Sequence, residues 1–185
     1  MTNPSQTNHS ESLPLQSLSV ERVTSGNPFA DYPQLRCIWH DGLQEHVEAD
    51  TVSDLLAGQE DKAENIVLLI RRNDEVIGIT GVYSMLNNPD DLGLRWHGII
   101  PSARKTKASA AAFYEVIKIV RLERKTKYRI IECIEMKDPN AGRLISHFLN
   151  LGFKCDGLAK DASEFPLECG LPQDSGNWQT MEYIL

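Results

Sequence analysis

A strand-like segment, a short basic loop and a long helix follow one another between residues 92 and 124, and this succession constrains the fold most. Residues 92–100 are mostly apolar and stop at Pro101, which lacks the N–H that a central strand would need. Residues 106–124 form the clearest helix, because apolar side chains recur on one face at helical spacing: Phe113, Val116, Ile117 and Val120. A helix with one apolar face needs a sheet or another helix against which to bury it.

Further strands are predicted where apolar residues alternate with polar ones or form short runs: 18–23, 66–70, 76–83, 128–136, 153–158 and 178–185. Helices are predicted at 34–46, at 51–59 with Thr51 as the N-cap, and from 138, where a Pro favours the first turn. The inner face of this last helix is predicted to be Leu144, Ile145, Phe148 and Leu149, with Gly152 at its end. Residues 160–177 are predicted to form a polar loop. Helices separate only some of the strands, which predicts an α/β chain with a mixed sheet.

The composition indicates an ordinary globular domain with an acidic balance. Residues 1–17 offer too few apolar side chains to offset the entropy of ordering, so we expect a disordered tail before a single domain at 18–185. The formal net charge is -7, and nucleic acids and anionic membranes attract basic surfaces, so we expect neither as a partner. The four cysteines form no C-x-x-C pair, and no metal site is expected. Without a signal-like or membrane-spanning run, we expect a cytoplasmic protein.

The segment from Trp96 to Ser109 carries the first family resemblance. A strand ends at a Pro, and the basic loop Arg104-Lys-Thr-Lys107-Ala-Ser109 leads into the long helix. This resembles the central motif of the GNAT acyltransferases, in which an Arg/Gln-x-x-Gly-x-Gly/Ala loop opens a helix. Lys107 and Ser109 stand where the family has Gly and Gly/Ala, so the loop diverges from that pattern.

A second resemblance lies farther along the chain, where Asp138-Pro-Asn140 is followed by Phe148 and by Gly152-Phe153. It is similar to the family's Asn, which is followed by an aromatic residue and a Gly-Phe pair at the end of the next helix. The resemblance implies a central, mostly antiparallel sheet of six to seven strands with helices on both faces. It also implies that acetyl-CoA, or coenzyme A, is a co-substrate and that no metal takes part.

The start of the long helix is the expected phosphate site. A helix N-terminus presents unpaired N–H groups and roughly half a positive elementary charge, which attract a pyrophosphate. Lys107 attracts phosphate as a flexible point charge, and the Ser109 hydroxyl can donate to it. The alternative is a plain solvated helix start. The backbone of the preceding strand can pair with pantetheine as an added strand would. The residues expected to bind the cofactor are Ile99, Ile100, Arg104, Lys105, Thr106, Lys107, Ala108, Ser109, Asn140 and Phe148.

Transfer of an acyl group to an amine requires a base that removes the ammonium proton. His97 is the first candidate, with a packed strand histidine as the alternative. Glu132 and Glu135 are the others, and for Glu132 the alternative is a solvent-facing strand residue. Many family members have a Tyr at the position of Phe148, where it protonates the leaving thiolate. Phe148 cannot do so, and His147 is turned by about 100° around the helix, so the proton would come from solvent.

These features predict an N-acetyltransferase that moves an acetyl group from acetyl-CoA to a primary amine of a small molecule, a peptide or a protein. The alternative is a catalytically weak GNAT-fold module that binds coenzyme A or regulates, which Lys107 and Phe148 would favour. An acetyltransferase acting on charged tRNA is disfavoured, because the acidic chain lacks the basic face that RNA requires. The sequence leaves the acceptor open, and a homodimer is one assembly that it allows.

Overall fold

The computed structural model describes residues 18–59, 65–85, 90–123, 127–155, 160–161 and 177–185. Within these ranges eight strands form one sheet in the order β1-β2-β3-β4-β5-β8-β6, with β7 also paired to β8. All pairs are antiparallel except β4–β5, which confirms the mixed, mostly antiparallel sheet. The strands are β1 (Leu18–Val23), β2 (Ile66–Arg72), β3 (Glu75–Ser84), β4 (Asp91–Ile99), β5 (Arg129–Glu135), β6 (Lys154–Cys155), β7 (Lys160–Asp161) and β8 (Asn177–Ile184).

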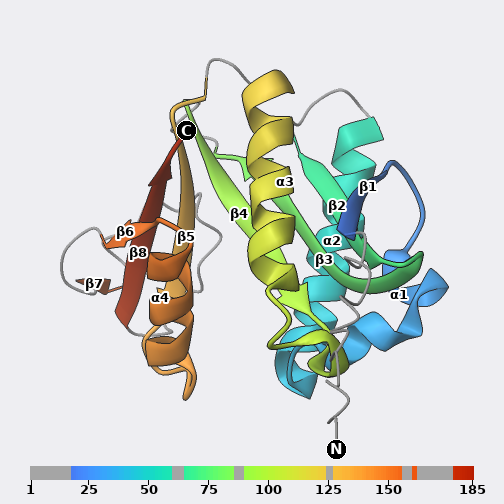
Figure 1. Cartoon of the computed structure of the whole chain (residues 1–185), viewed down its shortest axis with the longest axis horizontal. Helices are drawn as coiled ribbons and strands as arrows, with labels where there is room; N and C mark the ends of the chain where they lie inside the picture. The colour runs from blue at the N-terminus through green and yellow to red at the C-terminus, as the bar shows by residue number, and fades with distance from the viewer. Residues whose placement is uncertain (1–17, 60–64, 86–89, 124–126, 156–159, 162–176) are drawn as a thin grey trace, which may run out of the picture.

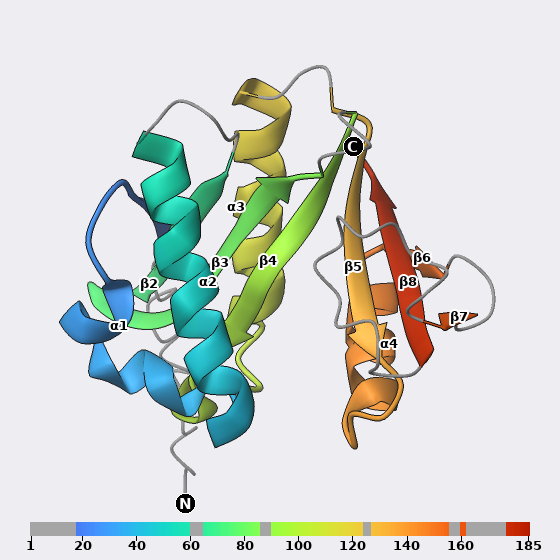
Figure 2. The same cartoon turned by 180° about the vertical axis from the view of Figure 1, so that it is seen from behind.

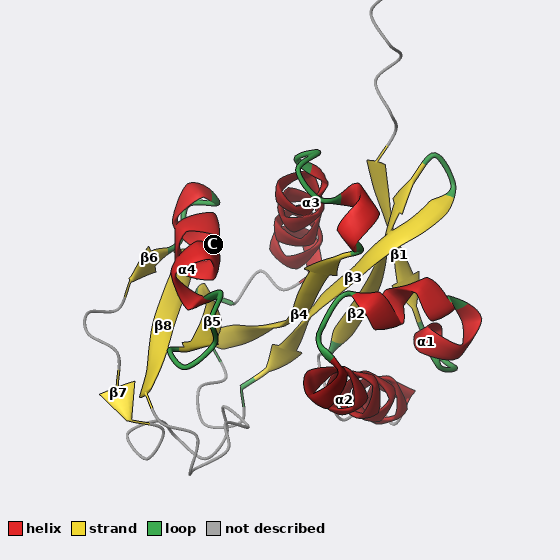
Figure 3. Cartoon of the chain, turned by 90° about the horizontal axis from the view of Figure 1, so that it is seen from below, coloured by secondary structure: helices red, strands yellow, loops and turns green. Residues whose placement is uncertain are grey.

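Helices cover both faces of the sheet, as predicted. The helices are α1 (Pro28–Asp31), α2 (Asp41–Gln59), α3 (Ala108–Glu123) and α4 (Ala141–Asn150), with 3-10 turns at η1 (Pro33–Cys37) and η2 (Pro101–Ala103). Helices α3 and α4 lie on one face (Figure 1), and α1 and α2 lie on the other (Figure 2). The view from below separates the two layers with the sheet between them (Figure 3). None of the described helices has both the length and the apolar character that crossing a membrane requires.

Each face of the sheet carries its own core. In β2, Val67 and Leu69 join the core under α1 and α2, whereas Ile66 and Leu68 join the core under α3 and α4. A strand that is buried on both faces needs apolar residues at every position, which explains the continuous run at 66–70. The predicted inner face of α3 is confirmed, since Phe113, Val116, Ile117 and Val120 are all buried.

Three predictions about helices were wrong. Residues 34–46 and 51–59 do not form two helices, because α2 runs without a break from Asp41 to Gln59. Thr51 is not an N-cap: its hydroxyl donates to the Val47 carbonyl at 2.8 Å, and this bond to the preceding turn satisfies the hydroxyl inside the helix. Leu149 does not lie on the inner face of α4, since its side chain is 47% exposed.

The outer strands also differ from prediction in places. The strand predicted at 153–158 is only the two-residue β6, and 156–159 lie outside the described residues. The predicted loop at 160–177 contains β7 at its start, because Lys160 and Asp161 pair with β8. Residues 162–176 and the predicted tail at 1–17 lie outside the described ranges. Gly152 has φ 98 after α4, which confirms the predicted left-handed residue at this helix end.

A β-bulge near the end of β4 shifts the alternation of side chains between the two faces of the sheet. The register of β3 against β4 shifts between Ile79 and Gly81, so that Thr80 faces two residues of β4, Trp96 and His97. Trp96 has φ 41 and contacts aromatic rings on the side of α2. The His97 ring instead faces α3, and this orientation is the starting point for the site.

Candidate active site

Strands β4 and β5 pair over only three residues and then diverge. Residues 91–93 pair with 129–131 in parallel, although β4 continues to Ile99 and β5 to Glu135. We call the point where they separate, after Gly93 and Ile131, the vertex. Figure 2 shows the two strands moving apart from their shared end. Beyond the vertex, the β4 backbone groups that face β5 have no ladder partner among the described residues, so this edge can hydrogen-bond an extended ligand.

The start of α3 lies directly beyond the open end of β4. Lys105 and Lys107 have φ 67 and 58, the left-handed region that glycine adopts most easily. Lys107 thus takes a conformation suited to the glycine that stands at its position in the family motif. The first helical hydrogen bond runs from the Ala111 amide to the Lys107 carbonyl at 3.0 Å, which leaves the N–H groups of residues 108–110 without helical partners. These N–H groups and the two exposed lysines form an anion-attracting end.

Two other polar residues of this loop are occupied by protein contacts. The Arg104 guanidinium donates to the Ile99 carbonyl at 3.1 Å and to the Ile38 carbonyl at 2.8 Å, so it joins the end of β4 to the segment before α2. The Thr106 hydroxyl donates to the Ala103 carbonyl at 2.6 Å. Arg72, at the end of β2, in turn donates to the Thr106 hydroxyl at 3.2 Å. Arg72 therefore brings a further cation to the loop, and no local sequence pattern indicated it.

The two isoleucines at the end of β4 differ in what their backbones can bind. The Ile100 amide donates to the Ile77 carbonyl at 2.9 Å, so the amide expected to meet pantetheine is already used within the sheet. N–H groups alternate in direction along a strand, which turns the Ile99 amide towards β5. Ile99 is therefore the residue of this pair whose amide can meet a ligand.

A chain of hydrogen bonds joins β3, β4, α3 and α4 through His97. Its Nδ1 lies 2.9 Å from the Thr80 hydroxyl, and its Nε2 lies 2.8 Å from the Ser109 hydroxyl. The same Ser109 hydroxyl lies 2.9 Å from Nε2 of His147 on α4. The two imidazole rings stand nearly parallel, at an interplanar angle of 18°. Both ring nitrogens of His97 are thus engaged, and so is the hydroxyl that was expected to reach phosphate.

Burial keeps both imidazoles neutral. Burial lowers the pKa of His97 to about 4, with a further contribution from the neighbouring His147 and a smaller opposing effect of Ser109. Burial, and then Arg143, also lowers the pKa of His147. At neutral pH each ring therefore carries one proton, and the Ser109 hydroxyl donates to one ring while it accepts from the other.

Glu132 is the first β5 residue beyond the vertex. It pairs with Met181 of β8 and lies between Ile130 and Ile134 on one face of the strand, and these three neighbours are buried. Its carboxyl group forms no hydrogen bond with the described residues. Burial raises the pKa of Glu132 to about 8, against the opposing effect of the Arg95 charge. Glu132 is therefore a carboxyl group that holds its proton near neutral pH, at the point where the two strands separate.

Arg95 is fixed on the α2 side of the vertex. Its guanidinium forms two hydrogen bonds with Asp54, at 2.7 and 3.0 Å, and one with Asp50 at 3.3 Å. It also lies 4.3 Å from the centre of the Tyr83 ring. Burial raises the pKa of Asp54, although the charge of Arg95 opposes the shift. The arrangement holds one positive charge close to Glu132 while acidic groups of α2 neutralise much of it.

Phe148 and Asn140 occupy different surroundings on α4. Phe148 is buried, with its ring centre 5.1 Å from that of Phe153, so it packs in the core, as predicted for the inner face of this helix. Asn140 is exposed at the start of α4, and its backbone N–H donates to the Asp138 carboxylate at 2.7 Å. Its side chain makes no capping bond.

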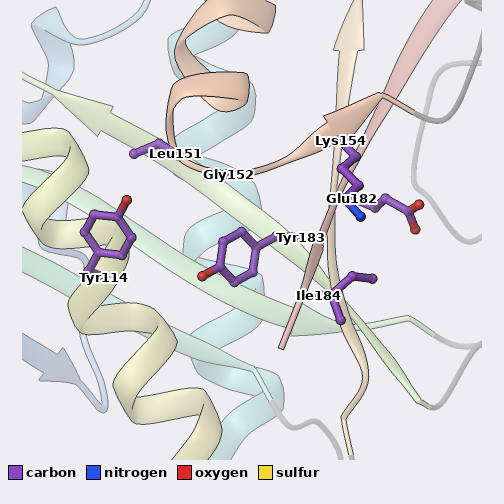
Figure 4. Close-up of a pocket in the computed structure, with 7 residues that line it drawn as sticks. All are labelled: Tyr114, Leu151, Gly152, Lys154, Glu182, Tyr183 and Ile184. Carbon is purple, nitrogen blue, oxygen red and sulfur yellow. The ribbon is translucent and has the colours of Figure 1, made fainter.

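A cavity of about 380 Å³ lies away from the vertex, between α3, the turn after α4, and β8. Tyr114, Gly152 and Tyr183 contribute to its wall, and Figure 4 shows the Tyr183 ring between the helix and the turn. No residue of β4 or β5 lines this cavity, so the cavity is separate from the groups at the vertex.

Comparison with solved structures identifies the architecture. An acetyltransferase of the GNAT family from Desulfovibrio desulfuricans superposes with a TM-score of 0.68 over 91% of this chain and 99% of its own, at 12% identity. The chain has the GNAT fold. An acetyltransferase of Salmonella typhimurium that modifies the N-terminal serine of ribosomal protein L7/L12 superposes with a TM-score of 0.62, at 12% identity, over 90% of this chain and 95% of its own.

A third GNAT-fold neighbour was solved with a ligand. The Bacillus subtilis acetyltransferase in complex with CoA has a TM-score of 0.59 and 13% identity, over 91% of this chain and 99% of its own. No family model and no curated protein sequence matches the chain. The likeness is therefore one of three-dimensional structure.

The GNAT fold of this chain brings some predicted site residues together and separates others. His97 and Ser109 are in contact, and Lys105 and Lys107 flank the start of α3, whereas Asn140 is exposed at the start of α4. The sequence interpretation missed His147, which was set aside because it is turned away from Phe148. Its spacing from Leu144 and Leu151, three residues after one and four before the other, was the available signal that it faces inward.

Proposed function

We propose that this protein transfers an acetyl group from acetyl-CoA to a primary amine. The observation that carries the proposal is the divergence of β4 and β5 after three paired residues, which leaves an unpaired strand edge that ends at the anion-attracting start of α3. An extended thioester with a pyrophosphate at one end fits such an edge. The GNAT fold supports the same activity, and the Bacillus subtilis neighbour was solved with CoA.

In this proposal the pyrophosphate meets the N–H groups of residues 108–110 together with Lys105 and Lys107. The pantetheine arm runs back along β4 towards the vertex and meets the Ile99 amide on the way. The six residues 94–99 span about 20 Å of extended strand. The thioester end of the cofactor then comes to lie nearest the vertex, beside Glu132.

The acceptor is proposed to be an amine of a small molecule, a peptide or a protein. The Salmonella typhimurium neighbour modifies an N-terminal serine, which supports a peptide N-terminus as one acceptor to test. A thermal-shift experiment with acetyl-CoA and with CoA, followed by thiol release across a panel of amines, tests the activity. No shift at about millimolar acetyl-CoA would exclude the enzyme, because a ligand that binds the folded state must stabilise it.

The second candidate is a GNAT-fold module that binds coenzyme A without turnover. The observation that favours it is the residue at position 148. Phe148 is a buried phenyl ring without a hydroxyl, so no phenol stands at the position of the family's acid. A thermal shift with CoA but no thiol release with any amine would support the module. Thiol release that depends on an amine would exclude it.

Lys107→Glu is expected to raise the Kd for CoA at least tenfold, which corresponds to about 1.4 kcal/mol. The substitution removes a positive charge from the proposed pyrophosphate site and places a negative one there. Isothermal titration with CoA measures the effect. Lys118→Glu is the matched control, because it makes the same change of charge on an exposed residue farther along α3. Equal affinities of the two variants would contradict the proposed position of the pyrophosphate.

His97→Ala is expected to lower kcat about tenfold or more at about pH 8, with a smaller change in KM. His97 was predicted as the base, but both its ring nitrogens bond to hydroxyl groups, so we propose that it positions Ser109 and the start of α3. His97→Gln should recover part of the rate, because an amide can also bond both hydroxyls. Unchanged kcat in His97→Ala would remove His97 from both roles.

A further inference from the structure

We propose that Glu132 is the acid that protonates the leaving thiolate of coenzyme A, in place of the phenol that this chain lacks at Phe148. The inference rests on the proposed acetyl transfer and assigns a residue and a direction of proton movement to it. The sequence predicted Glu132 as a base that takes a proton from the amine. Here Glu132 first donates its proton to the thiolate and takes a proton only afterwards.

The face on which Glu132 lies is the first argument. Direct neighbours across an antiparallel pair share one face, and Glu132 pairs with Met181. Met181 belongs to the core that lies under α3 and α4, together with Ile134 and Phe148. Glu132 therefore lies on the side of the sheet where the family's acid would project from α4. The same core that buries Phe148 surrounds the stem of Glu132.

The position along the strand is the second argument. Glu132 directly follows the last residue of β5 that pairs with β4. The proposed cofactor has its phosphates at the start of α3, so its sulfur end reaches the region of the vertex. A carboxyl group there forms no hydrogen bond with the described residues and keeps its own proton available to a ligand.

The state of the neighbouring groups is the third argument. The imidazoles of His97 and His147 are neutral, and a neutral imidazole is a far weaker acid than a carboxyl group. The pKa of Glu132, raised to about 8 by burial, lies close to that of a free thiol, about 8.5, which favours transfer between the two. Arg95 limits the shift, because its charge stabilises the carboxylate once the proton has left.

The proton balance of the step is complete. The ammonium form of the acceptor first loses one proton to solvent, and the neutral amine then attacks the thioester carbonyl carbon. As the C–S bond breaks, the thiolate takes the proton of Glu132 and leaves as the free thiol. The Glu132 carboxylate then takes the remaining excess proton from the new amide nitrogen, which restores the carboxyl group for the next turnover.

A comparison of kcat for the wild type and Glu132→Gln tests the direction of proton transfer. The ratio of the two kcat values is measured by thiol release from about pH 6 to 10. Gln keeps the size of the side chain but transfers no proton, so the wild type should be about 100-fold faster below about pH 7. If Glu132 is the acid, the ratio falls as pH rises through about 8, because the wild type then loses the proton it must donate. A ratio that rises through the same range would overturn the proposal, since it is the behaviour of a base. The protonation of the acceptor cancels in the ratio.

Glu75→Gln, at the exposed first residue of β3, is the matched control and should equal the wild type at every pH. The falling limb of kcat near pH 8 in the wild type is a second measurement that needs no variant, and its absence would also overturn the assignment. A ratio close to one at all pH values would overturn it while acetyl transfer stands. Absence of both CoA binding and thiol release in the wild type would instead overturn the proposed function.

Discussion

Glu132→Gln is expected to be more stable than the wild type by about 1–3 kcal/mol at about pH 8.5, and nearly equal to it at about pH 4.5. Burial raises the pKa of Glu132 to about 8, against 4.5 for an ordinary glutamate. Between these values the folded state keeps a proton that the unfolded state releases, so stability falls as pH rises from 4.5 through 8. Gln is neutral at every pH and avoids this loss. The expected difference is smaller than the full shift in pKa would give, because the Glu132 side chain is only partly buried and solvent screens its charge.

Urea denaturation of both proteins at the two pH values measures the effect. Glu75→Gln again serves as control, since it removes one exposed carboxyl group without changing the vertex. A difference of the same size at both pH values would show that the substitution acts through packing and not through ionisation. Together with the expected loss of turnover, greater stability would mean that Glu132 is kept at a cost to the fold, as is common for groups at active sites.

Between about pH 6.5 and 4 the wild type is expected to lose about 2–3 kcal/mol of stability relative to His97→Asn. Burial lowers the pKa of His97 from 6.5 to about 4, so in this window the unfolded state takes up a proton that the folded state refuses. The contribution of the neutral ring is fully present above pH 6.5 and is lost as pH falls towards 4. Asn keeps a short polar side chain and has no proton to gain.

Denaturation curves at about pH 7 and pH 4.5 give the comparison, because acid-sensitive carboxylates elsewhere affect both proteins equally. His40→Asn, which removes an exposed imidazole before α2, should follow the wild type at both values. Equal pH dependence of the wild type and His97→Asn would contradict the neutral, buried ring. It would also weaken the case that the bond from His97 holds Ser109.

The prediction of the fold succeeded where the signal was local. The apolar face of α3 and the continuous run in β2 depend on the periodicity of neighbouring residues, and both appear as predicted. The prediction of two helices in place of α2 was wrong because Thr51 can cap a helix start or lie inside a helix. Here it lies inside, where its hydroxyl donates to the Val47 carbonyl. The prediction that Leu149 faces inward was wrong because an apolar residue next to the buried face of a helix can still point outward.

The candidate site was predictable in part for the same reason. Lys105, Lys107 and Ser109 could be proposed because a strand, a loop and a helix start adjoin one another in the chain. His147 and Arg72 could not, because they reach the loop from α4 and β2 and their positions depend on how distant elements pack. The bulge that turns His97 towards α3 is likewise a property of the pairing of two strands.

The sequence by itself determined most of the elements and their order, the acidic charge, and the basic loop before α3, since each depends on residues close together in the chain. Tertiary structure alone decided that β4 and β5 separate after three pairs, that His97 bonds Ser109, and that Glu132 lies beyond the vertex among buried apolar residues. The physical reason is that desolvation and hydrogen bonding depend on which groups surround a side chain. For Glu132 and His97 those groups come from elements far away in the sequence, and they set which proton each residue holds.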